Sequence, residues 1–272
     1  FSISMPRPVF VNALPKSGTN LVGDCLDLLG MLPKAHVGAQ ALRSPSWARL
    51  LKRLVFLPTR RSYLVGIDMP IEAPNWYIDR RLNGLAPDEY ITAHVGYTAD
   101  VLHEVVKRDI APILVTRDPR AVVNSFVHYL DEAVRHPLYK AFQDQSLHSR
   151  YMLAMEGMFA NEVTLQPIDV RCQAVRPWTQ HRDVLHIRFE DLIGPEGGGA
   201  ADVQRAAVKR IVDHVEAPTD KIDVVLDHLF GKNENTFRSG QIDAWRKEIP
   251  SAVRDDLDAQ TQPIRDMWGY ST

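Results

Sequence analysis

The 272-residue sequence contains only two cysteines, Cys25 and Cys172, and lacks any apolar run near the ~18 residues that a membrane-spanning helix needs. Two cysteines are too few for a disulfide framework, so we expect both thiols to be reduced and structural. The amino-terminal residues also lack a signal-peptide pattern, which favours a cytoplasmic protein. The chain begins at Phe1 instead of methionine, which indicates a trimmed chain or a domain excised from a longer polypeptide.

An excess of charge of one sign is missing too. The chain has 32 basic and 34 acidic residues, a net charge of −2. No overall charge would therefore attract nucleic acid or a lipid surface, and we predict neither a nucleic-acid partner nor a membrane span. Any anion-binding site must be local. With 45% hydrophobic and 24% charged residues, the composition is that of an ordinary globular protein.

Short apolar runs alternate with helical patterns along the chain. Strands are predicted at residues 8–14, 90–94, 112–116 and 184–189. Helices are predicted from about residue 19, at 119–129, at 201–215 and at 219–229, the second because Asp118 is a good N-cap and Pro119 a good first residue. This alternation predicts an α/β fold with a central, mainly parallel sheet flanked by helices. We expect one domain over residues 1–272, with 131–180 as a helical elaboration and candidate substrate lid.

The turn Pro15-Lys16-Ser17-Gly18-Thr19-Asn20 lies between the first predicted strand and its helix. The first N–H groups of a helix have no partner within it, and the helix dipole is positive there. Gly18 allows close backbone approach, Lys16 adds a full charge, and Ser17 and Thr19 add hydroxyl groups. Together they indicate an anion cradle, a P-loop-like phosphate turn. An ordinary exposed turn capped by Ser17 or Thr19 would give the same short pattern.

A Walker A loop is the obvious competitor, because it also binds phosphate between a strand and a helix. That loop has the form G-x-x-x-x-G-K-[ST], whereas Lys16 here precedes the turn's glycine and Ala13 replaces an early glycine. The strand at 112–116 ends in Thr116 and Arg117, where a Walker B strand would carry a Mg²⁺-binding aspartate. These differences disfavour a P-loop kinase or nucleotide hydrolase.

A second candidate anion site follows the strand at 112–116. Arg117 is at the strand end, and Ser125 is two turns into the following helix. Both side chains would reach one anion if the strand end lies against the flank of the helix. Arginine suits this role because its planar guanidinium donates two hydrogen bonds to phosphate oxygens. The alternative is that Arg117 forms a surface ion pair with Asp118 or another acid.

At this point the sequence resembles the PAPS-dependent sulfotransferase family, whose donor is 3′-phosphoadenosine 5′-phosphosulfate. Four family motifs appear in family order between residues 9 and 245. They are LPKSGTN at the phosphate turn, TRDPRAVVNS around Arg117, FEDL from Phe189, and FRSG ending at Gly240, which Trp245 follows. Any one of these short motifs would be weak evidence, whereas four in order are specific.

The resemblance implies the roles of the donor-site residues. Lys16, Ser17, Gly18, Thr19 and Asn20 would bind the 5′ end of PAPS. The 3′-phosphate would be held by four residues, Arg117, Ser125, Arg238 and Gly240, with Ser239 beside them. Phe189 would complete the cofactor site, and the desulfated nucleotide PAP would be the product. No metal is expected, because Lys16 and the helix N-terminus supply the positive charge.

Three positions depart from the family pattern. Leu21 stands where the family often has a tryptophan that stacks on adenine, and Phe189 replaces the usual tyrosine. Ser239 replaces a lysine that would contact the 3′-phosphate. These changes concern adenine recognition and donor affinity, while the donor class is unaffected.

Sulfuryl transfer to an alcohol requires a base, cationic groups near the leaving phosphate and an in-line arrangement. His94 ends the strand at 90–94, where a family histidine serves as the base, so we predict that His94 accepts the acceptor's proton. Lys16 would stabilise the leaving phosphate. His36, His128 and His186 are interpreted as structural or peripheral, although a lone histidine such as His94 is often structural too.

The acceptor is predicted to be a small or medium-sized hydroxyl compound, or one bound to a carrier. Residues 43–61 carry six basic and no acidic residues, and would either form a surface for an anionic or lipid-like acceptor or a helix with a solvated basic face. Three methionines and Phe159 within 152–159 fit an adaptable apolar pocket or plain core packing. A non-catalytic relative that only binds nucleotide remains an alternative. The oligomeric state is left open.

Overall fold

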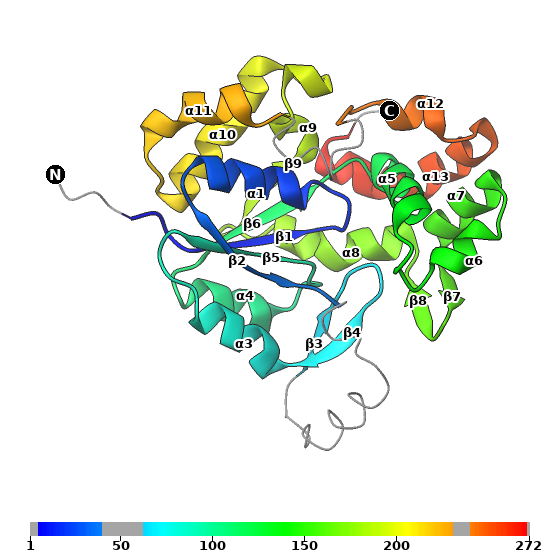
Figure 1. Cartoon of the computed structure of the whole chain (residues 1–272), viewed down its shortest axis with the longest axis horizontal. Coiled ribbons are helices and arrows are strands. Elements are labelled where there is room, and N and C mark those ends of the chain that lie inside the picture. Colours follow the sequence, from blue (N-terminus) through cyan, green and yellow to red (C-terminus); the bar gives the residue numbers. More distant parts are fainter. Residues whose placement is uncertain (1–4, 40–61, 231–239, 271–272) are drawn as a thin grey trace.

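The computed structural model describes residues 5–39, 62–230 and 240–270. Its centre is a sheet of five strands, namely β1 (Val9–Ala13), β2 (Leu32–Val37), β5 (Glu89–Ala93), β6 (Ala111–Thr116) and β9 (Leu185–Arg188). They lie in the order β2-β5-β1-β6-β9, and every neighbouring pair is parallel (Figure 1). This arrangement confirms the predicted α/β fold with a central, mainly parallel sheet.

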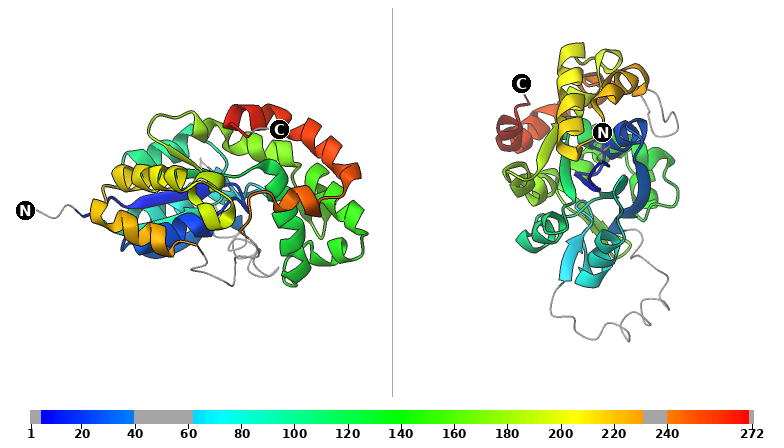
Figure 2. Two further views of the ribbon diagram at one scale, coloured as in Figure 1. Left: turned by 90° about the horizontal axis from the view of Figure 1, so that it is seen from above. Right: turned by 90° about the vertical axis from the view of Figure 1, so that its left-hand side faces the viewer.

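Helices cover both faces of the sheet (Figures 1 and 2). One face carries α1 (Thr19–Leu28), α10 (Ala201–Val215) and α11 (Ile222–His228). The other carries α3 (Asn75–Asn83), α4 (Ala99–Val106) and α8 (Ile168–Thr179). Side chains of β1 alternate between the two cores, with Val9 and Val11 on the α1 side and Phe10 on the other. Burial on both faces explains why the strand is apolar at nearly every position.

A helical lobe lies beyond the carboxyl ends of the strands, on the right in Figure 1. It contains α5 (Pro119–Glu132), α6 (Tyr139–Gln143), α7 (Leu147–Glu156), α12 (Ala244–Glu248) and α13 (Ser251–Trp268). Two hairpins flank it, one of β3 (Ser62–Val65) and β4 (Ile71–Pro74), the other of β7 (Met158–Ala160) and β8 (Val163–Leu165). The segment 131–180 is therefore not purely helical, because it also contains the β7–β8 hairpin.

The remaining elements follow β9. They are α9 (Phe189–Leu192) and the short 3₁₀ helices Pro195–Gly197 and Thr219–Lys221. The strand predicted at 184–189 ends one residue early, because Phe189 already begins α9. The helix predicted to end near Tyr129 continues to Glu132.

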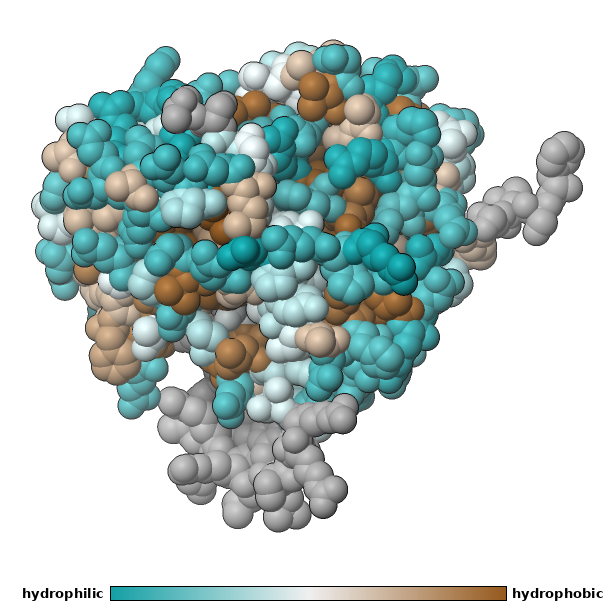
Figure 3. Space-filling model, turned by 180° about the vertical axis from the view of Figure 1, so that it is seen from behind, coloured by the Kyte–Doolittle hydropathy of each residue, from teal (hydrophilic) through white to brown (hydrophobic). Residues whose placement is uncertain are grey.

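Both cysteines are buried and free, as predicted. Within the described ranges, no helix is long and apolar enough to cross a membrane. The face opposite to that of Figure 1 is mainly hydrophilic, and its hydrophobic residues lie in separate small groups (Figure 3).

Candidate active site

The phosphate turn after β1 depends on two residues in left-handed backbone conformations. Lys16 has φ 70° and Gly18 has φ 97°. A Cβ atom on Gly18 would lie 2.7 Å from Cδ2 of the Phe189 ring, closer than real Cβ contacts allow. Glycine is therefore required at this position for its backbone conformation and for its close approach to Phe189.

Two hydroxyl groups of the turn are buried without a partner. Among the described residues, neither Ser17 Oγ nor Thr19 Oγ1 has a hydrogen-bond partner. Buried polar groups are normally hydrogen-bonded, so such groups at a helix N-terminus fit a site that receives an anion. Asn20 follows in the first turn of α1 and is exposed. The residues from 17 to 20 thus offer what a phosphate or phosphosulfate group requires.

Lys16 lies against helix α5. Its Nζ is 4.2 Å from the ring centroid of Tyr129, a cation–π contact. Burial and the nearby Arg117 lower the pKa of Lys16 to about 8, and Glu132 partly opposes this effect. Ser125, Tyr129 and Glu132 are spaced four and three residues apart, so they share the face of α5 that meets the turn. Tyr129 was not predicted from the sequence, although its spacing from Ser125 was a signal for it.

Arg117 joins the phosphate turn to the end of β9. Its guanidinium lies 4.2 Å from the ring centroid of Phe189, and its Nη1 donates to the carbonyl oxygen of Lys16 at 3.5 Å. β6 and β1 are neighbours in the sheet, which brings Arg117 to the turn despite their distance in sequence. Phe189 is buried between Gly18 and Arg117, so it supports both predicted anion-binding segments.

Glu190 fixes the segment that carries Arg117. Its Oε1 accepts a hydrogen bond from the backbone N–H of Asp118 at 2.9 Å. Its buried Oε2 has no hydrogen-bond partner among the described residues. Burial raises the pKa of Glu190 to about 7, although the Asp118 hydrogen bond and Arg117 lower it. The FEDL motif was recognised in the sequence, but this role of its glutamate was not predicted.

Arg120 has a structural role at the start of α5. Its guanidinium forms ion pairs with Asp118 at 2.7 Å and Asp258 at 2.8 Å. It also lies 4.1 Å from the ring centroid of Trp245. These contacts connect the start of α5 to α12 and α13.

His94 is held by hydrogen bonds to three neighbouring segments. The backbone N–H of His94 donates to the Val37 carbonyl at 3.0 Å, and the backbone carbonyl of His94 accepts from the Gly66 N–H at 2.7 Å. Its ring Nδ1 is 2.7 Å from the Ala13 carbonyl oxygen. Because a carbonyl oxygen can only accept, Nδ1 carries the hydrogen and Nε2 keeps a lone pair. Nε2 is therefore the ring nitrogen of His94 that can accept a proton.

Asn12 holds the chain next to His94. Its Nδ2 donates to the Val95 carbonyl at 2.8 Å, and the Val95 N–H donates back to its Oδ1 at 2.9 Å. The side chain thus continues the hydrogen bonding between β1 and β5 beyond the last strand pair. Asn12 was not predicted as a site residue, although a polar residue within the apolar run VFVNA was a signal for it.

Burial lowers the pKa of His94 and keeps the imidazole neutral near pH 7, with Lys16 acting in the same direction. The Ala13 carbonyl and the Asp68 carboxylate raise its pKa and partly offset burial. A neutral imidazole is the form that can accept a proton.

His36, which we interpreted as structural or peripheral, packs directly on His94. The two ring centroids are 5.0 Å apart in an edge-to-face arrangement. His36 Nδ1 also lies 2.8 Å from Thr92 Oγ1, and burial together with His94 lowers the pKa of His36 to about 4. On its other side, His36 lines a cavity of about 400 Å³ between α1 and the β2–β5 edge of the sheet. Thr19 and Asn20 of the predicted donor site also line this cavity, whereas Arg117 and Phe189 are not among its lining residues.

The other predicted site residues are divided between described and undescribed parts of the chain. Ser125 is half-buried on α5. Gly240, with φ 57°, lies against Gly197, because a Cβ on Gly197 would be 2.7 Å from the Gly240 carbonyl oxygen. Arg238 and Ser239 lie outside the described residues, as does the basic segment 43–61.

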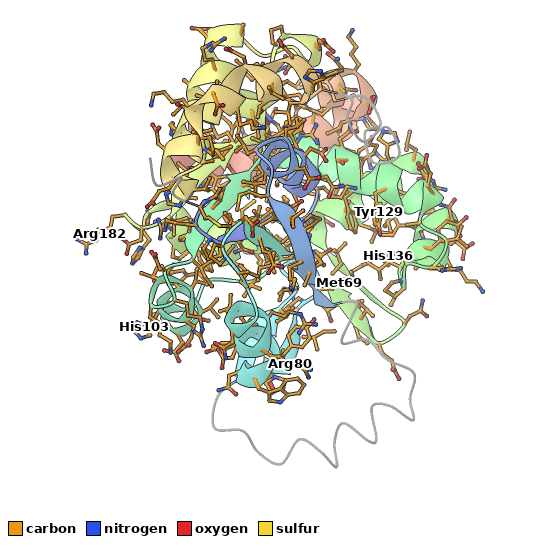
Figure 4. All side chains as sticks on the ribbon, turned by 60° about the vertical axis from the view of Figure 1, so that its left-hand side comes forward. Met69, Arg80, His103, Tyr129, His136 and Arg182 are labelled. Carbon is orange, nitrogen blue, oxygen red and sulfur yellow. The ribbon has the colours of Figure 1, made fainter. Side chains whose placement is uncertain are left out.

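The methionine-rich segment 152–159 is not one uniform surface. Met155 is buried in the core, Met152 and Met158 are half-buried, and Phe159 is 73% exposed. In the lobe, the ring centroids of Tyr129 and His136, both labelled in Figure 4, are 5.8 Å apart in an edge-to-face arrangement. Within residues 5–39, 62–230 and 240–270, no three histidines, cysteines or acids lie together where they could hold a metal ion.

Comparison with solved structures shows the same fold. A mouse sulfotransferase in complex with PAP superimposes with a TM-score of 0.58 at 13% identity, over 95% of this chain and 85% of that one. A retinol dehydratase in complex with androsterone and inactive cofactor PAP gives 0.62 at 14% identity, over 96% and 81% of the two chains. A search of curated proteins finds no match.

The family model of the sulfotransferase domain matches residues 6–269, nearly the whole chain. The match includes the phosphate turn, the segment around Arg117, His94 and the FEDL segment. Because this match covers nearly the whole chain, it excludes the P-loop kinase or hydrolase that we considered as an alternative. The chain therefore belongs to the sulfotransferase family, which confirms the family predicted from its four motifs.

Proposed function

We propose that this sulfotransferase transfers the sulfuryl group of PAPS to a hydroxyl of a small or medium-sized acceptor. His94 is the base, and Lys16 stabilises the leaving phosphate. The observation that carries the proposal is the 2.7 Å contact between His94 Nδ1 and the Ala13 carbonyl, which leaves Nε2 as the proton acceptor next to the phosphate turn. The solved sulfotransferase and retinol dehydratase with this fold were both crystallised with PAP, which supports this donor.

The donor side is supported by the residues around the turn. Ser17 Oγ and Thr19 Oγ1 are buried hydroxyls without hydrogen-bond partners in the described chain, as expected for groups that bind a ligand oxygen. Lys16 lies in the turn and Arg117 lies beside it, so each brings a positive charge to the proposed donor site. We propose that Arg117, Ser125 and Gly240, with Arg238 and Ser239, hold the 3′-phosphate, and that the residues from 16 to 20 hold the 5′-phosphosulfate. The ring of Phe189 packs against the Arg117 guanidinium and helps to hold it in position.

Proton transfer and sulfuryl transfer take place in one step, in which each new bond replaces one that breaks. The acceptor's O–H bond breaks, and the proton moves to Nε2 of His94. The oxygen's electron pair forms the new bond to sulfur, and the bond between sulfur and the bridging oxygen breaks. Lys16 stabilises the negative charge that appears on the departing phosphate of PAP.

The acceptor is proposed only by chemical class. The structurally similar retinol dehydratase has been crystallised with androsterone and with retinol, both of which are apolar compounds with a hydroxyl group. By comparison we propose an acceptor with one reactive hydroxyl, either free or bound to a carrier. The segment 131–180 remains a proposed lid over it.

An acceptor-library assay with labelled PAPS tests this function. Wild-type protein should transfer label to at least one hydroxyl compound, and PAP should raise its melting temperature. His94→Ala should abolish transfer, because it removes the proposed proton acceptor Nε2, while PAP binding stays nearly intact.

His103→Ala is the matched control. His103 is exposed on α4, away from Tyr129 and Met69 (Figure 4), so this variant should keep full activity. Substantial turnover by His94→Ala would refute the base assignment. Failure of PAP to shift the melting temperature of the wild type would refute the donor assignment.

A further inference from the structure

The hydrogen bonding between β1 and β5 changes where β1 runs into the phosphate turn. The two strands are parallel, and their last Cα partners are Asn12 and Ala93. In a regular parallel pair, a residue bonds to the two residues that flank its partner on the neighbouring strand. If the pairing continued, the Val95 N–H would therefore donate to the Ala13 carbonyl, and the Val95 carbonyl would accept from residue 15 of the other strand.

The sequence does not allow the pairing to continue in this way. Residue 15 is a proline, which has no N–H to donate, and Val95 is fully buried, so an unpaired carbonyl there would be costly. The Asn12 side chain supplies both groups that Val95 needs. Its Nδ2 donates to the Val95 carbonyl at 2.8 Å, and its Oδ1 accepts from the Val95 N–H at 2.9 Å. The carboxamide thus takes the place of a peptide group of β1.

This replacement leaves the Ala13 carbonyl to another donor, the ring of His94. The distance from His94 Nδ1 to the Ala13 oxygen is 2.7 Å. Asn12 and Ala13 are consecutive in β1, and His94 and Val95 are consecutive after β5, so two adjacent residues hold two adjacent residues. Asn12 is fully buried, so solvent does not compete for these bonds.

We propose that Asn12 is a positioning residue that sets the tautomer of His94. The inference rests on the proposed role of His94 as the base. Because the amide pairs with Val95, the Ala13 carbonyl accepts from Nδ1 of His94, and Nε2 keeps its lone pair for the acceptor's proton. Without the amide, the Val95 N–H would turn to the Ala13 carbonyl, as in a regular parallel pair. The ring would then lose the bond that favours hydrogen on Nδ1.

The test compares the wild type with Asn12→Leu, which keeps the size of the side chain and removes both hydrogen-bonding groups. In NMR spectra of protein with isotope-labelled histidine, His94 of the wild type should carry hydrogen on Nδ1, and the variant should contain the form with hydrogen on Nε2. The kcat should fall about tenfold or more, because a general base contributes about 10²–10⁴-fold. The KM for PAPS should change little.

Gln204→Leu is the matched control. Gln204 on α10 is also a buried amide, and its Nε2 donates to the Leu192 carbonyl at 3.1 Å. This variant should lower the melting temperature but leave the His94 tautomer and kcat in place. Asn12→Asp keeps an oxygen for the Val95 N–H, so it should retain more of the Nδ1–H form than Asn12→Leu does. If Asn12→Leu fails to fold, Asn12→Ala is measured in the same way.

A folded Asn12→Leu whose His94 tautomer is that of the wild type would overturn this inference. An active wild type with hydrogen on Nε2 of His94 would overturn it too, and that measurement needs no variant. Equal losses of kcat in Asn12→Leu and Gln204→Leu, with one tautomer throughout, would indicate a purely structural role and count against it. A wild type that transfers no sulfuryl group to any acceptor would instead refute the proposed function, while the spectra would still decide whether Asn12 sets the tautomer.

Discussion

At the scale of single residues, the phosphate turn depends on backbone conformations that side chains disfavour. Gly18 and Gly30 both have a positive φ, 97° and 92°. They differ in their surroundings, because the Cβ of an alanine would meet the Phe189 ring at Gly18 and nothing within 4 Å at Gly30. Alanine substitutions at the two glycines therefore separate two contributions to stability. Gly30→Ala measures the free-energy cost of the backbone conformation alone, and Gly18→Ala adds the cost of the contact with Phe189.

Gly30→Ala should destabilise the protein by about 1–2 kcal/mol, the cost of a left-handed conformation for a residue with a Cβ. Gly18→Ala should cost more, because Phe189 is buried and has little room to move. It should also weaken PAP binding, while Gly30→Ala should not. Chemical denaturation and calorimetric titration with PAP measure the two effects. Equal costs in the two variants would contradict the proposed close packing of Gly18 on Phe189.

Whether a site residue can be predicted from the sequence depends on how far along the chain its contact partner lies. Lys16 and Arg117 could be predicted because each belongs to a local motif at a strand end. Asn12 and Tyr129 were not predicted, because the tertiary fold sets what they contact and each left only a weak signal in the sequence. The partner of Asn12, Val95, is 83 residues away. A polar residue in an apolar strand indicates that it has a partner, but its type does not indicate which residue that partner is.

At the scale of elements, one side chain connects the start of α9 to the start of α5. Glu190 accepts the Asp118 N–H, and Arg117 is the residue before Asp118. This hydrogen bond links the FEDL segment to the segment that carries Arg117, which is predicted to bind the 3′-phosphate. Such a buried carboxyl group is also a source of pH-dependent stability.

Glu190→Gln should remove this pH dependence. Burial raises the pKa of Glu190 from 4.5 to about 7, so its favourable contribution is full below pH 4.5 and is lost as the pH rises through 7. The free energy of unfolding of the wild type should thus fall relative to the variant between pH 5 and pH 8, by up to about 3 kcal/mol. Denaturation curves of both proteins at several pH values measure the difference. A difference that stays constant with pH would contradict it.

The strands that were predicted from the sequence are the buried strands of the central sheet. Each is an apolar run between turn residues, which is the pattern that burial on both faces requires. The edge strand β2 was missed because LPKAHV is mostly exposed and polar at alternate positions. The two hairpins and α13 were missed as well. Their sequences contain proline or short mixed segments, and tertiary contacts decide their structure.

At the scale of the whole molecule, the end of the described chain packs back on the sheet. Tyr270 Oη lies 3.1 Å from Thr116 Oγ1, at the end of β6. Thr116 Oγ1 is also 2.7 Å from His186 Nε2, which agrees with a structural role for that histidine. Helix α13 contributes Trp268 to the larger core, so the carboxyl-terminal segment helps to hold β6, which positions Arg117.

Trp268→Ala should destabilise the protein by about 3–5 kcal/mol, because it leaves a large cavity in the core. Met267→Ala, one residue away and 39% exposed, should change stability by less than about 1 kcal/mol. Urea denaturation of both variants measures the contrast. Similar small effects in the two would show that α13 is not part of the cooperative core.

The strand order β2-β5-β1-β6-β9 has a consequence for how the catalyst can change. The chain leaves β1 towards one edge of the sheet, returns, and then builds the other edge, so that β1 is a topological switch point. His94, the proposed base, follows β5, whereas Arg117, Phe189 and Glu190 follow β6 and β9. Under the proposed roles, the base and the 3′-phosphate-binding arginine therefore come from opposite sides of β1. We expect substitutions around the β2–β5 half to change acceptor preference more than donor binding.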